Sequence, residues 1–258
     1  MRIARFVADS DPLYGVVEGE SGSEEVTVIK GDPFFNGVER STVKYKLEDV
    51  RLLAPIIPRS KVVGVGRNFV EHAKELGNEV PQHPLLFLKP NTSVVGPNDP
   101  IVLPEFSDEV SFEAELCVVI GRICKDVPED RVDDVIFGYT CGNDLTARDV
   151  QKTDLQWARA KGFDTSAPLG PWIETELDTE DLRIQGWLNG ELRQDGSTSQ
   201  MIRGVRELVS VVSQAFTLLP GDVIMTGTPA GVGVVAAGDR FDVEIEGIGR
   251  LSNPVVRR

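Results

Sequence analysis

The sequence predicts a mainly β, α+β fold in which a small N-terminal β domain precedes a larger domain. Short apolar runs bounded by glycine, proline or asparagine recur along the chain, which is the pattern of strands. Helical spacing of apolar residues is sustained only over residues 201–218. Pro55 and Pro58 interrupt regular structure, so we place the boundary beside them, with domains at residues 1–57 and 58–258.

The elements are expected in the following order. Strands are expected at residues 2–8, 25–30, 61–66, 84–89, 111–120, 132–140 and 222–226, with a strand pair at 240–251. A hairpin at residues 182–195 turns at Asn189-Gly190. Asn68 is expected to cap a short helix that Gly77 ends. The helix at 201–218 ends at Pro220-Gly221 and turns its apolar face to the core.

The composition is that of an ordinary globular protein and argues against some partners. The chain has 258 residues, 41% of them hydrophobic, which is enough for a sizeable core. Its net charge of −14 disfavours a nucleic-acid partner, because phosphate binding needs a basic surface. No stretch approaches the roughly 20 apolar residues that span a bilayer, and the first residues lack an apolar signal core. We therefore expect a cytoplasmic protein without a membrane partner.

Metal sites that need histidine or cysteine are not expected. Cys117, Cys124 and Cys141 are odd in number and lack a C-x-x-C spacing, so free thiols are expected rather than a disulfide framework. The histidines are His72 and His83, and the second lies in a proline-bounded loop that we expect at the surface. A zinc site or an iron site with two histidines is disfavoured for this reason.

The strand at residues 111–120 carries two acidic residues that need an explanation. Glu113 and Glu115 are two positions apart and therefore face the same side of the strand. They either belong to an edge strand with a solvated face or share a cation, because unpaired buried carboxylates are costly. Asp144 follows the strand at 132–140 and a Gly-Asn turn, and is placed to supply a third carboxylate. Three carboxylates without sulfur ligands suit Mg²⁺ or Mn²⁺, whereas Ca²⁺ prefers more protein ligands.

His72 and Glu75 lie three residues apart on the short helix and so share one helical face. A carboxylate beside an imidazole fixes its tautomer and raises its basicity, as a general base for water requires. The alternative is an ordinary surface His–Glu pair.

Other segments indicate a small anionic ligand. The glycine-rich loop at residues 226–233 offers backbone N–H groups to an anion, but it lacks the lysine of a phosphate loop. We therefore expect a carboxylate or keto acid rather than a nucleotide. Lys89 ends an apolar strand and either snorkels to solvent or reaches such a ligand, and Lys161 lies in a mixed-charge loop. Gly64 and Gly66 match the start of a dinucleotide-binding fingerprint, but Phe69 occupies the position of its third glycine. A dinucleotide site is therefore not expected.

Several motifs in one order resemble the fumarylacetoacetate hydrolase family over residues 58–258. They are Arg67-Asn68-Phe69 with His72 and Glu75, Phe112 to Leu116, Gly142 to Asp149 with Gln151, Lys161 to Thr165, and Thr226 to Gly231. The first 57 residues resemble the small N-terminal β domain of bacterial members. Phe69 departs from the pattern, since many relatives carry tyrosine there.

The resemblance implies a fold, a cofactor and site residues. It implies a rolled mixed β-sheet with few helices, usually in a homodimer, and Mg²⁺ or Mn²⁺ as the cofactor. The residues it implies are the metal ligands Glu113, Glu115 and Asp144, the dyad His72 and Glu75, and the ligand contacts Lys89, Gln151, Lys161 and Thr228. We also predict that Arg67 binds the substrate and that Lys161 is catalytic. His72 and Glu75 match a dyad on a mobile lid helix of members that cleave acylpyruvates.

The hypothesis for the reaction is C–C bond cleavage in a 2-oxo acid through an enolate that the metal stabilises. Lys161 adds positive charge at the enolate, and the His72–Glu75 pair activates water to hydrolyse an acylpyruvate. The same site would decarboxylate oxaloacetate without that water. One alternative is an isomerase or decarboxylase acting on 2-hydroxyhepta-2,4-diene-1,7-dioate in aromatic catabolism. An alternative of another class is a metal-stabilised binding protein without turnover.

Overall fold

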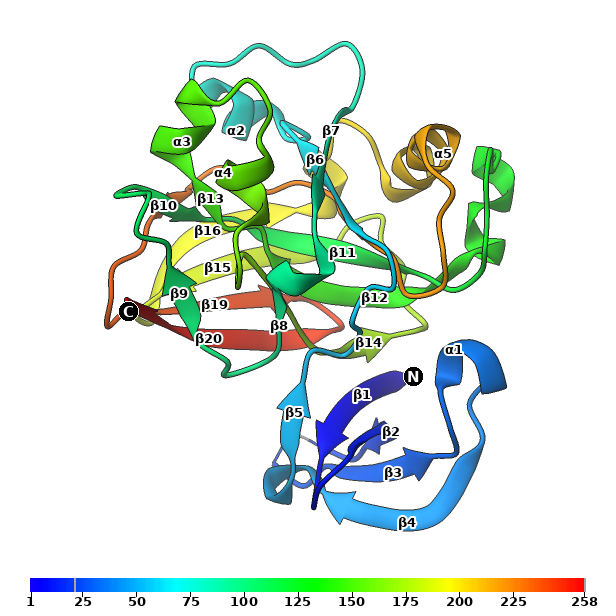
Figure 1. The fold of residues 1–258 in the computed structure, drawn as a ribbon. Coiled ribbons are helices and arrows are strands. Elements are labelled where there is room, and N and C mark those ends of the chain that lie inside the picture. The colour runs from blue at the N-terminus through cyan, green and yellow to red at the C-terminus, as the bar shows by residue number, and fades with distance from the viewer. Residues whose placement is uncertain (21, 258) are drawn as a thin grey trace.

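The computed structural model describes residues 1–20 and 22–257 and confirms a mainly β fold with few helices (Figure 1). The N-terminal unit, blue in Figure 1, is a twisted antiparallel sheet with short connections. Its elements are β1 (Arg2–Val7), β2 (Pro12–Glu18), β3 (Glu25–Ile29), α1 (Pro33–Asn36), β4 (Arg40–Lys46), η1 (Leu47–Asp49) and β5 (Arg51–Leu53). Among the described residues, no helix is both long and apolar enough to cross a membrane.

The sheet of the N-terminal unit continues into the larger part of the chain, because β1 pairs with β14. The strand order is β4-β3-β2-β1-β14-β12-β11-β17-β6-β7, with β5 beside β1 and β8 beside β14. The strands of the larger part are β6 (Val62–Gly66), β7 (Leu85–Lys89), β8 (Val94–Val95), β11 (Ala114–Ile120), β12 (Ile136–Asn143), β14 (Ala167–Glu174) and β17 (Val223–Met225). The sheet is mixed, as predicted, since β17 runs parallel to β6 and β8 runs parallel to β14.

A second sheet packs against β11 and β12 and closes the main core. Its order is β16-β15-β19-β20-β9, and a small sheet of order β13-β10-β18 lies beside it. The strands are β9 (Ile101–Leu103), β10 (Val110–Phe112), β13 (Thr146–Ala147), β15 (Arg183–Leu188), β16 (Glu191–Ser197), β18 (Gly233–Val234), β19 (Arg240–Ile245) and β20 (Gly249–Arg257). Phe112 and Phe241 stack in this core with ring centroids 4.1 Å apart. Burial of such aromatic surface is a main source of core stability.

The helices are short and lie at the rim of the sheets. They are α2 (Val70–Glu75), α3 (Arg148–Thr153), α4 (Ala158–Gly162) and α5 (Val205–Ala215), with 3₁₀ turns η2 (Asn91–Ser93), η3 (Glu129–Asp134) and η4 (Thr198–Gln200). Figure 1 shows α2, α3 and α4 gathered at the end of the molecule away from the N-terminal unit. These three helices border the site described below.

Several local predictions are confirmed, but the strand predicted at residues 111–120 is divided into β10 and β11 with Glu113 between them, and residues 132–134 of the strand predicted at 132–140 lie in the 3₁₀ turn η3. The hairpin β15–β16 turns at Asn189 and Gly190, both with positive φ, as a type I′ turn requires. Gly77 has φ of 68° just after α2, as predicted. The three cysteines are free and buried, and His83 is exposed. The prediction that Asn68 caps α2 is wrong, because its side chain instead bonds the backbone of Arg203 and Thr226.

Candidate active site

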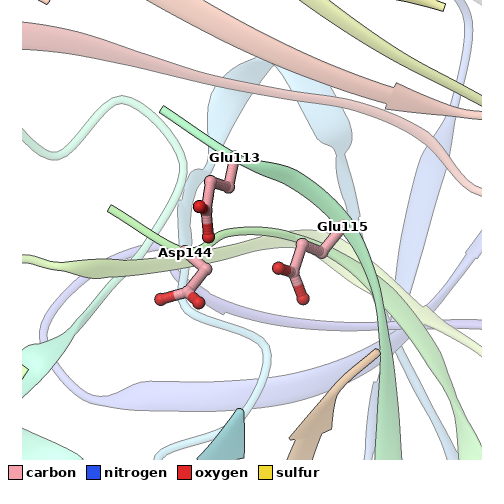
Figure 2. Close-up of side chains that lie close together, drawn as sticks. All are labelled: Glu113, Glu115 and Asp144. Carbon is pink, nitrogen blue, oxygen red and sulfur yellow. The ribbon is translucent and has the colours of Figure 1, made fainter. Parts of the chain in front are cut away.

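The three acidic residues converge at one end of the central sheet (Figure 2). Glu113 and Glu115 flank Ala114 at the start of β11, and Ala114 pairs with Asn143 of β12, so Asp144 follows directly beside them. One oxygen from each carboxylate lies within 4.8 Å of the others, and all three residues are buried. The alternative of a solvated edge strand is wrong, because β11 is flanked by β12 and β17.

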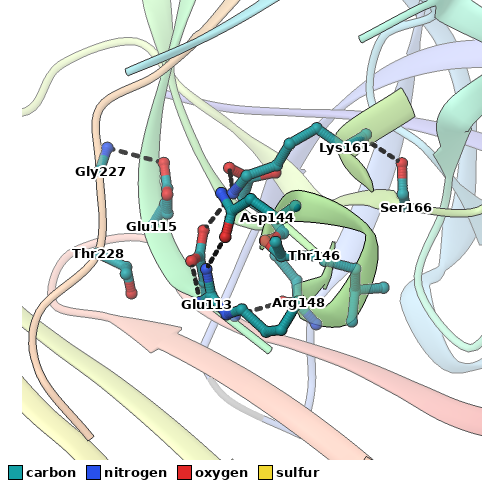
Figure 3. Close-up of polar contacts among 12 residues, drawn as sticks. Glu113, Glu115, Asp144, Thr146, Arg148, Lys161, Ser166, Gly227 and Thr228 are labelled. Carbon is teal, nitrogen blue, oxygen red and sulfur yellow. Dashed lines mark hydrogen bonds and ion pairs between the residues drawn. The ribbon is translucent and has the colours of Figure 1, made fainter. Parts of the chain in front are cut away.

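Two cationic side chains hold Glu113 (Figure 3). Lys161 Nζ lies 2.7 Å from Glu113 Oε2 and 2.6 Å from Asp144 Oδ2, and Arg148 donates to Glu113 Oε1. Burial alone would raise the pKa of Glu113, but Lys161, Arg148 and His72 outweigh it and hold the pKa well below its usual range. Burial lowers the pKa of Lys161, yet Asp144 and Glu113 raise it overall. Both groups are therefore charged at neutral pH.

Glu115 has a different environment from its two neighbours. Its Oε2 accepts a hydrogen bond of 2.8 Å from the Gly227 N–H, and among the described residues it forms no ion pair. Burial, with Asp144 and Glu113 nearby, raises the pKa of Glu115 well above its usual value. A carboxylate in such a place requires either a proton or a cation.

The residues present fit a divalent metal ion. Among the described residues, Asp144 Oδ1 is buried with no hydrogen-bond partner of good geometry, and it forms an ion pair with Lys89 Nζ at 2.8 Å. The same ammonium also donates to the carbonyl and hydroxyl oxygens of Ser166. The donor set is entirely oxygen, which suits Mg²⁺ or Mn²⁺ better than zinc.

Lys89, which was predicted to contact the ligand, lies beside Asp144 and does not line the pocket described below. It is 1% exposed, and its ammonium donates to the carbonyls of Leu145, Lys161 and Ser166. Burial, opposed by Asp144, lowers the pKa of Lys89. The side chain ties β7 to the loops that carry Asp144 and Lys161, so its place in the structure is behind the carboxylates.

Replacing Lys89 with methionine is expected to lower the free energy of unfolding by about 3–5 kcal/mol, because Asp144 and the carbonyls lose a buried cation. Urea unfolding in the presence of a chelator measures this loss without any contribution from metal. Lys152→Met is the matched control, since Lys152 forms an exposed pair with Glu109, which is worth about 1 kcal/mol or less. Equal stabilities of the two variants would contradict the structural role of Lys89.

A pocket of about 290 Å³ opens in front of the carboxylates. Of the predicted residues, it is lined by Arg67, His72, Glu113, Glu115, Gln151, Lys161 and Thr228. Glu75, Lys89 and Asp144 do not line it. Other lining residues were not predicted as site residues: Val65, Gly66, Leu76, Asn78, Arg148, Lys152 and Trp157. A pocket of this size accommodates a small organic acid.

Arg148 is the most important residue that was missed. It is buried, binds Glu113, and donates to Gln151 Oε1 over 3.0 Å. It lies four residues after Asp144 in a segment that the sequence had already marked as a motif. A buried arginine beside acidic residues is a signal for an ion pair, because guanidinium binds carboxylates in a fixed geometry.

His72 and Glu75 lie on α2, and His72 lines the pocket beside Glu113. His72 Nδ1 is 3.4 Å from Glu75 Oε2, and Glu75 also accepts from the Gly231 N–H at 3.0 and 3.2 Å. His72 Nε2 is 3.9 Å from Glu113 Oε1. The imidazole is buried, unlike that of a surface pair, and burial, opposed by Glu113, lowers the pKa of His72. Near neutral pH the ring is therefore uncharged and able to accept a proton.

The fold and this pocket define a strand-rich protein with a buried carboxylate–lysine site. Models of known families cover nearly the whole chain: "Rv2993c-like, N-terminal" matches residues 1–55 and "Fumarylacetoacetate (FAA) hydrolase C-terminal" matches residues 61–256. The chain belongs to the fumarylacetoacetate hydrolase family, whose enzymes act on small organic acids and use divalent metal ions.

Individual relatives are named as enzymes of several different reactions. The Xenopus laevis protein named oxaloacetate tautomerase fahd2, mitochondrial, is 43% identical over 220 residues, covering 81% of this chain and 69% of the relative. The crystal structure of 2-hydroxyhepta-2,4-diene-1,7-dioate isomerase from Mycobacterium marinum superposes with a TM-score of 0.93 at 48% identity, covering 100% of this chain and 99% of that one. Maleylpyruvate hydrolase from Sphingobium sp. SYK-6, in complex with manganese(II) and pyruvate, has a TM-score of 0.79 at 32% identity, covering 100% and 99%.

Proposed function

We propose that the protein is a Mg²⁺- or Mn²⁺-dependent enzyme that acts on a 2-oxo acid through its enolate, with Glu113, Glu115 and Asp144 as the metal ligands. The observation that carries this proposal is the convergence of three buried carboxylates within 4.8 Å, two of which, Glu113 and Glu115, line a pocket together with His72 and Lys161. When bound there, a divalent ion supplies Lewis acidity for negative charge on the 2-oxo group.

The protein's own side chains have distinct parts in this proposal. Lys161 keeps Glu113 and Asp144 in place and provides fixed positive charge in the pocket, where an enolate develops negative charge. Gln151, oriented by Arg148, and Thr228 line the pocket and orient the substrate. His72, with Nδ1 facing Glu75, has Nε2 free to take a proton from water or from carbon.

The first candidate reaction is C–C bond cleavage. In an acylpyruvate, water activated by His72 attacks the distal carbonyl and pyruvate leaves as its enol. In oxaloacetate, the bond to CO₂ breaks and no water is needed. The buried imidazole of His72, which lines the pocket and has Nδ1 facing Glu75, supports the hydrolytic version, because a neutral imidazole beside a carboxylate can accept a proton from a bound water.

The second candidate is proton transfer without bond cleavage, that is, tautomerisation or isomerisation of a 2-oxo diacid. It is favoured by the relatives named oxaloacetate tautomerase and 2-hydroxyhepta-2,4-diene-1,7-dioate isomerase. Here His72 moves a proton at C3 of the same enolate. Both candidates use the same pocket, so product analysis has to separate them.

The test is turnover of four substrates with Mg²⁺ or Mn²⁺, before and after chelation: acetylpyruvate, keto-oxaloacetate, enol-oxaloacetate and 2-hydroxyhepta-2,4-diene-1,7-dioate. Pyruvate release reports cleavage, and loss of enol absorbance without pyruvate reports tautomerisation. The outcome that overturns the proposal is metal binding without turnover of any of the four, which would favour the non-catalytic binding protein.

Arg67 is proposed to bind the second carboxylate of a diacid. It lines the pocket and, among the described residues, makes no hydrogen bond or ion pair. Arg67→Met is expected to raise KM for oxaloacetate roughly 10- to 100-fold, because a charged hydrogen bond contributes about 1.5–3 kcal/mol. KM for acetylpyruvate, which has one carboxylate, should change little. Steady-state kinetics of both substrates measure this, with exposed Arg122→Met as the control, and a parallel rise for both substrates would refute the assignment.

We also propose a cytoplasmic homodimer, with the two domains at residues 1–57 and 58–258. The family resemblance supports the dimer, and the family matches at residues 1–55 and 61–256 support the division. Light scattering after size-exclusion chromatography tests the dimer, because a single species at 28.2 kDa would contradict it.

A further inference from the structure

The strand segment between the two glutamates is fixed along both of its edges. On one edge, Glu113 is hydrogen-bonded to the end of β12. Its N–H donates to Asn143 Oδ1 over 2.9 Å, and its C=O accepts from the N–H of Asp144, the residue that follows β12, over 2.9 Å. On the other edge, β17 pairs only with Cys117 to Val119, so it does not reach Ala114. Ala114 lies between the two proposed ligands, and its backbone N–H and C=O point to that second edge.

Side chains replace the missing strand at Ala114. The N–H of Ala114 donates to Gln194 Oε1 over 2.9 Å, and its C=O accepts from Thr228 Oγ1 over 2.8 Å. Gln194 Nε2 closes the ring by donating to Thr228 Oγ1 over 2.7 Å and to the Pro229 carbonyl over 2.8 Å. The carboxamide of Gln194 thus offers one acceptor and one donor, as the peptide group of a neighbouring strand would.

The fold keeps space for this carboxamide. Gln194 is on β16, is fully buried, and does not line the pocket. It stands opposite Gly186 of β15, where a Cβ atom would come within 2.9 Å of Gln194 Oε1. A side chain at position 186 would therefore displace the carboxamide.

We propose that Gln194 is a positioning residue that sets the separation and direction of the Glu113 and Glu115 carboxylates by holding the peptide of Ala114. It also orients the Thr228 hydroxyl, which lies alongside this strand at the pocket (Figure 3). Without the carboxamide, the buried N–H of Ala114 loses its acceptor and the strand segment must shift to find another. The two glutamates move with it, because they are its immediate neighbours in the chain.

The proposal rests on the metal site proposed above, and its test uses Mn²⁺ alone as the probe. Gln194→Leu keeps the approximate volume and removes both polar functions. It is expected to weaken Mn²⁺ affinity roughly 10- to 100-fold, the range for groups that orient metal ligands. Isothermal titration of the full-length protein gives the affinity, and circular dichroism with a melting curve in chelator confirms that the variant is folded.

Thr198→Val is the matched control. Thr198 is buried near the end of the same hairpin and accepts a hydrogen bond of 2.7 Å from the Leu182 N–H, but among the described residues it forms no hydrogen bond with the strand of the glutamates. This variant should lose stability while its Mn²⁺ affinity stays within about twofold of wild type, since mutations at distant sites are independent. A comparable loss of affinity in both variants would overturn the proposal, because the effect would then be a general consequence of lower stability.

A second variant covers the case in which Gln194→Leu does not fold. Gln194→Glu keeps the shape and the acceptor for Ala114 but places an oxygen against the Pro229 carbonyl, so an intermediate loss of Mn²⁺ affinity is expected. If a folded Gln194→Leu binds Mn²⁺ with wild-type affinity, the proposed role of Gln194 is overturned while the proposed function stands. The same holds for Gln194→Glu if it is the only variant that folds. If the wild-type protein itself fails to bind Mn²⁺, the proposed function and this inference fail together.

Discussion

Replacing Glu115 with glutamine is expected to reduce metal-dependent turnover at least about a thousandfold while leaving the fold intact. A bound metal ion would stabilise the negative charge of the transition state by several kcal/mol, and each 1.36 kcal/mol corresponds to a factor of ten in rate. Glutamine keeps the size of the side chain and can still accept from the Gly227 N–H, but it lacks the charge that holds a cation. The measurements are turnover of oxaloacetate with saturating Mn²⁺ and Mn²⁺ affinity by titration.

Thermal stability measured in chelator distinguishes loss of the metal site from misfolding in Glu115→Gln. Burial raises the pKa of Glu115, so the folded state takes up a proton or keeps an unpaired charge at any pH above the normal glutamate pKa. Either condition disfavours folding, so in chelator Glu115→Gln should melt at the same temperature as wild type or higher. Exposed Glu105→Gln is the control and should change neither activity nor stability. Full activity of a metal-free Glu115→Gln enzyme would remove the metal from the mechanism.

The carboxylate site could be predicted from the sequence because its members are linked by short-range geometry. Two residues apart on a strand means the same face, which placed Glu113 and Glu115 together although the structure ends β10 at Phe112 and begins β11 at Ala114. Asp144 required one further assumption, that the strand ending at Asn143 pairs with the one beginning at Ala114, and the structure has that register. The order of the motifs along the chain indicated the family, and the contacts among the site residues came from the structure.

The residues behind the carboxylates could not be predicted, because they depend on contacts between distant parts of the chain. The end of its apolar strand left Lys89 either at solvent or at a ligand, and the family resemblance implied the ligand, but the carbonyls that surround it come from residues 56 to 77 positions later. Gln194 reaches Ala114 across 80 positions, and nothing in its hairpin sequence marks it. A buried polar side chain that bonds a backbone N–H or C=O group can be predicted only when it is known that no neighbouring strand bonds that group.

Replacing His72 with glutamine is expected to separate the reactions that share the enolate. Hydrolysis of acetylpyruvate should fall by roughly 10²- to 10⁴-fold, the usual contribution of a general base, because no other neutral imidazole lines the described pocket. Decarboxylation of oxaloacetate should stay within a few fold of wild type, since it requires no activated water. Glu75→Gln should have a smaller effect on hydrolysis, because Glu75 acts through His72 Nδ1 and does not line the pocket.

The control for His72 is the other histidine of the chain. His83 is exposed in its loop, so His83→Gln removes an imidazole without touching the pocket and should leave all rates unchanged. Pyruvate release and enol absorbance, followed in parallel for each variant, give the three rates. If ketonisation of enol-oxaloacetate falls together with hydrolysis, His72 moves protons at carbon as well as at water, which favours the tautomerase candidate. Hydrolysis at the wild-type rate in His72→Gln would exclude His72 as the base and leave the enolate chemistry to Lys161 and the metal ligands.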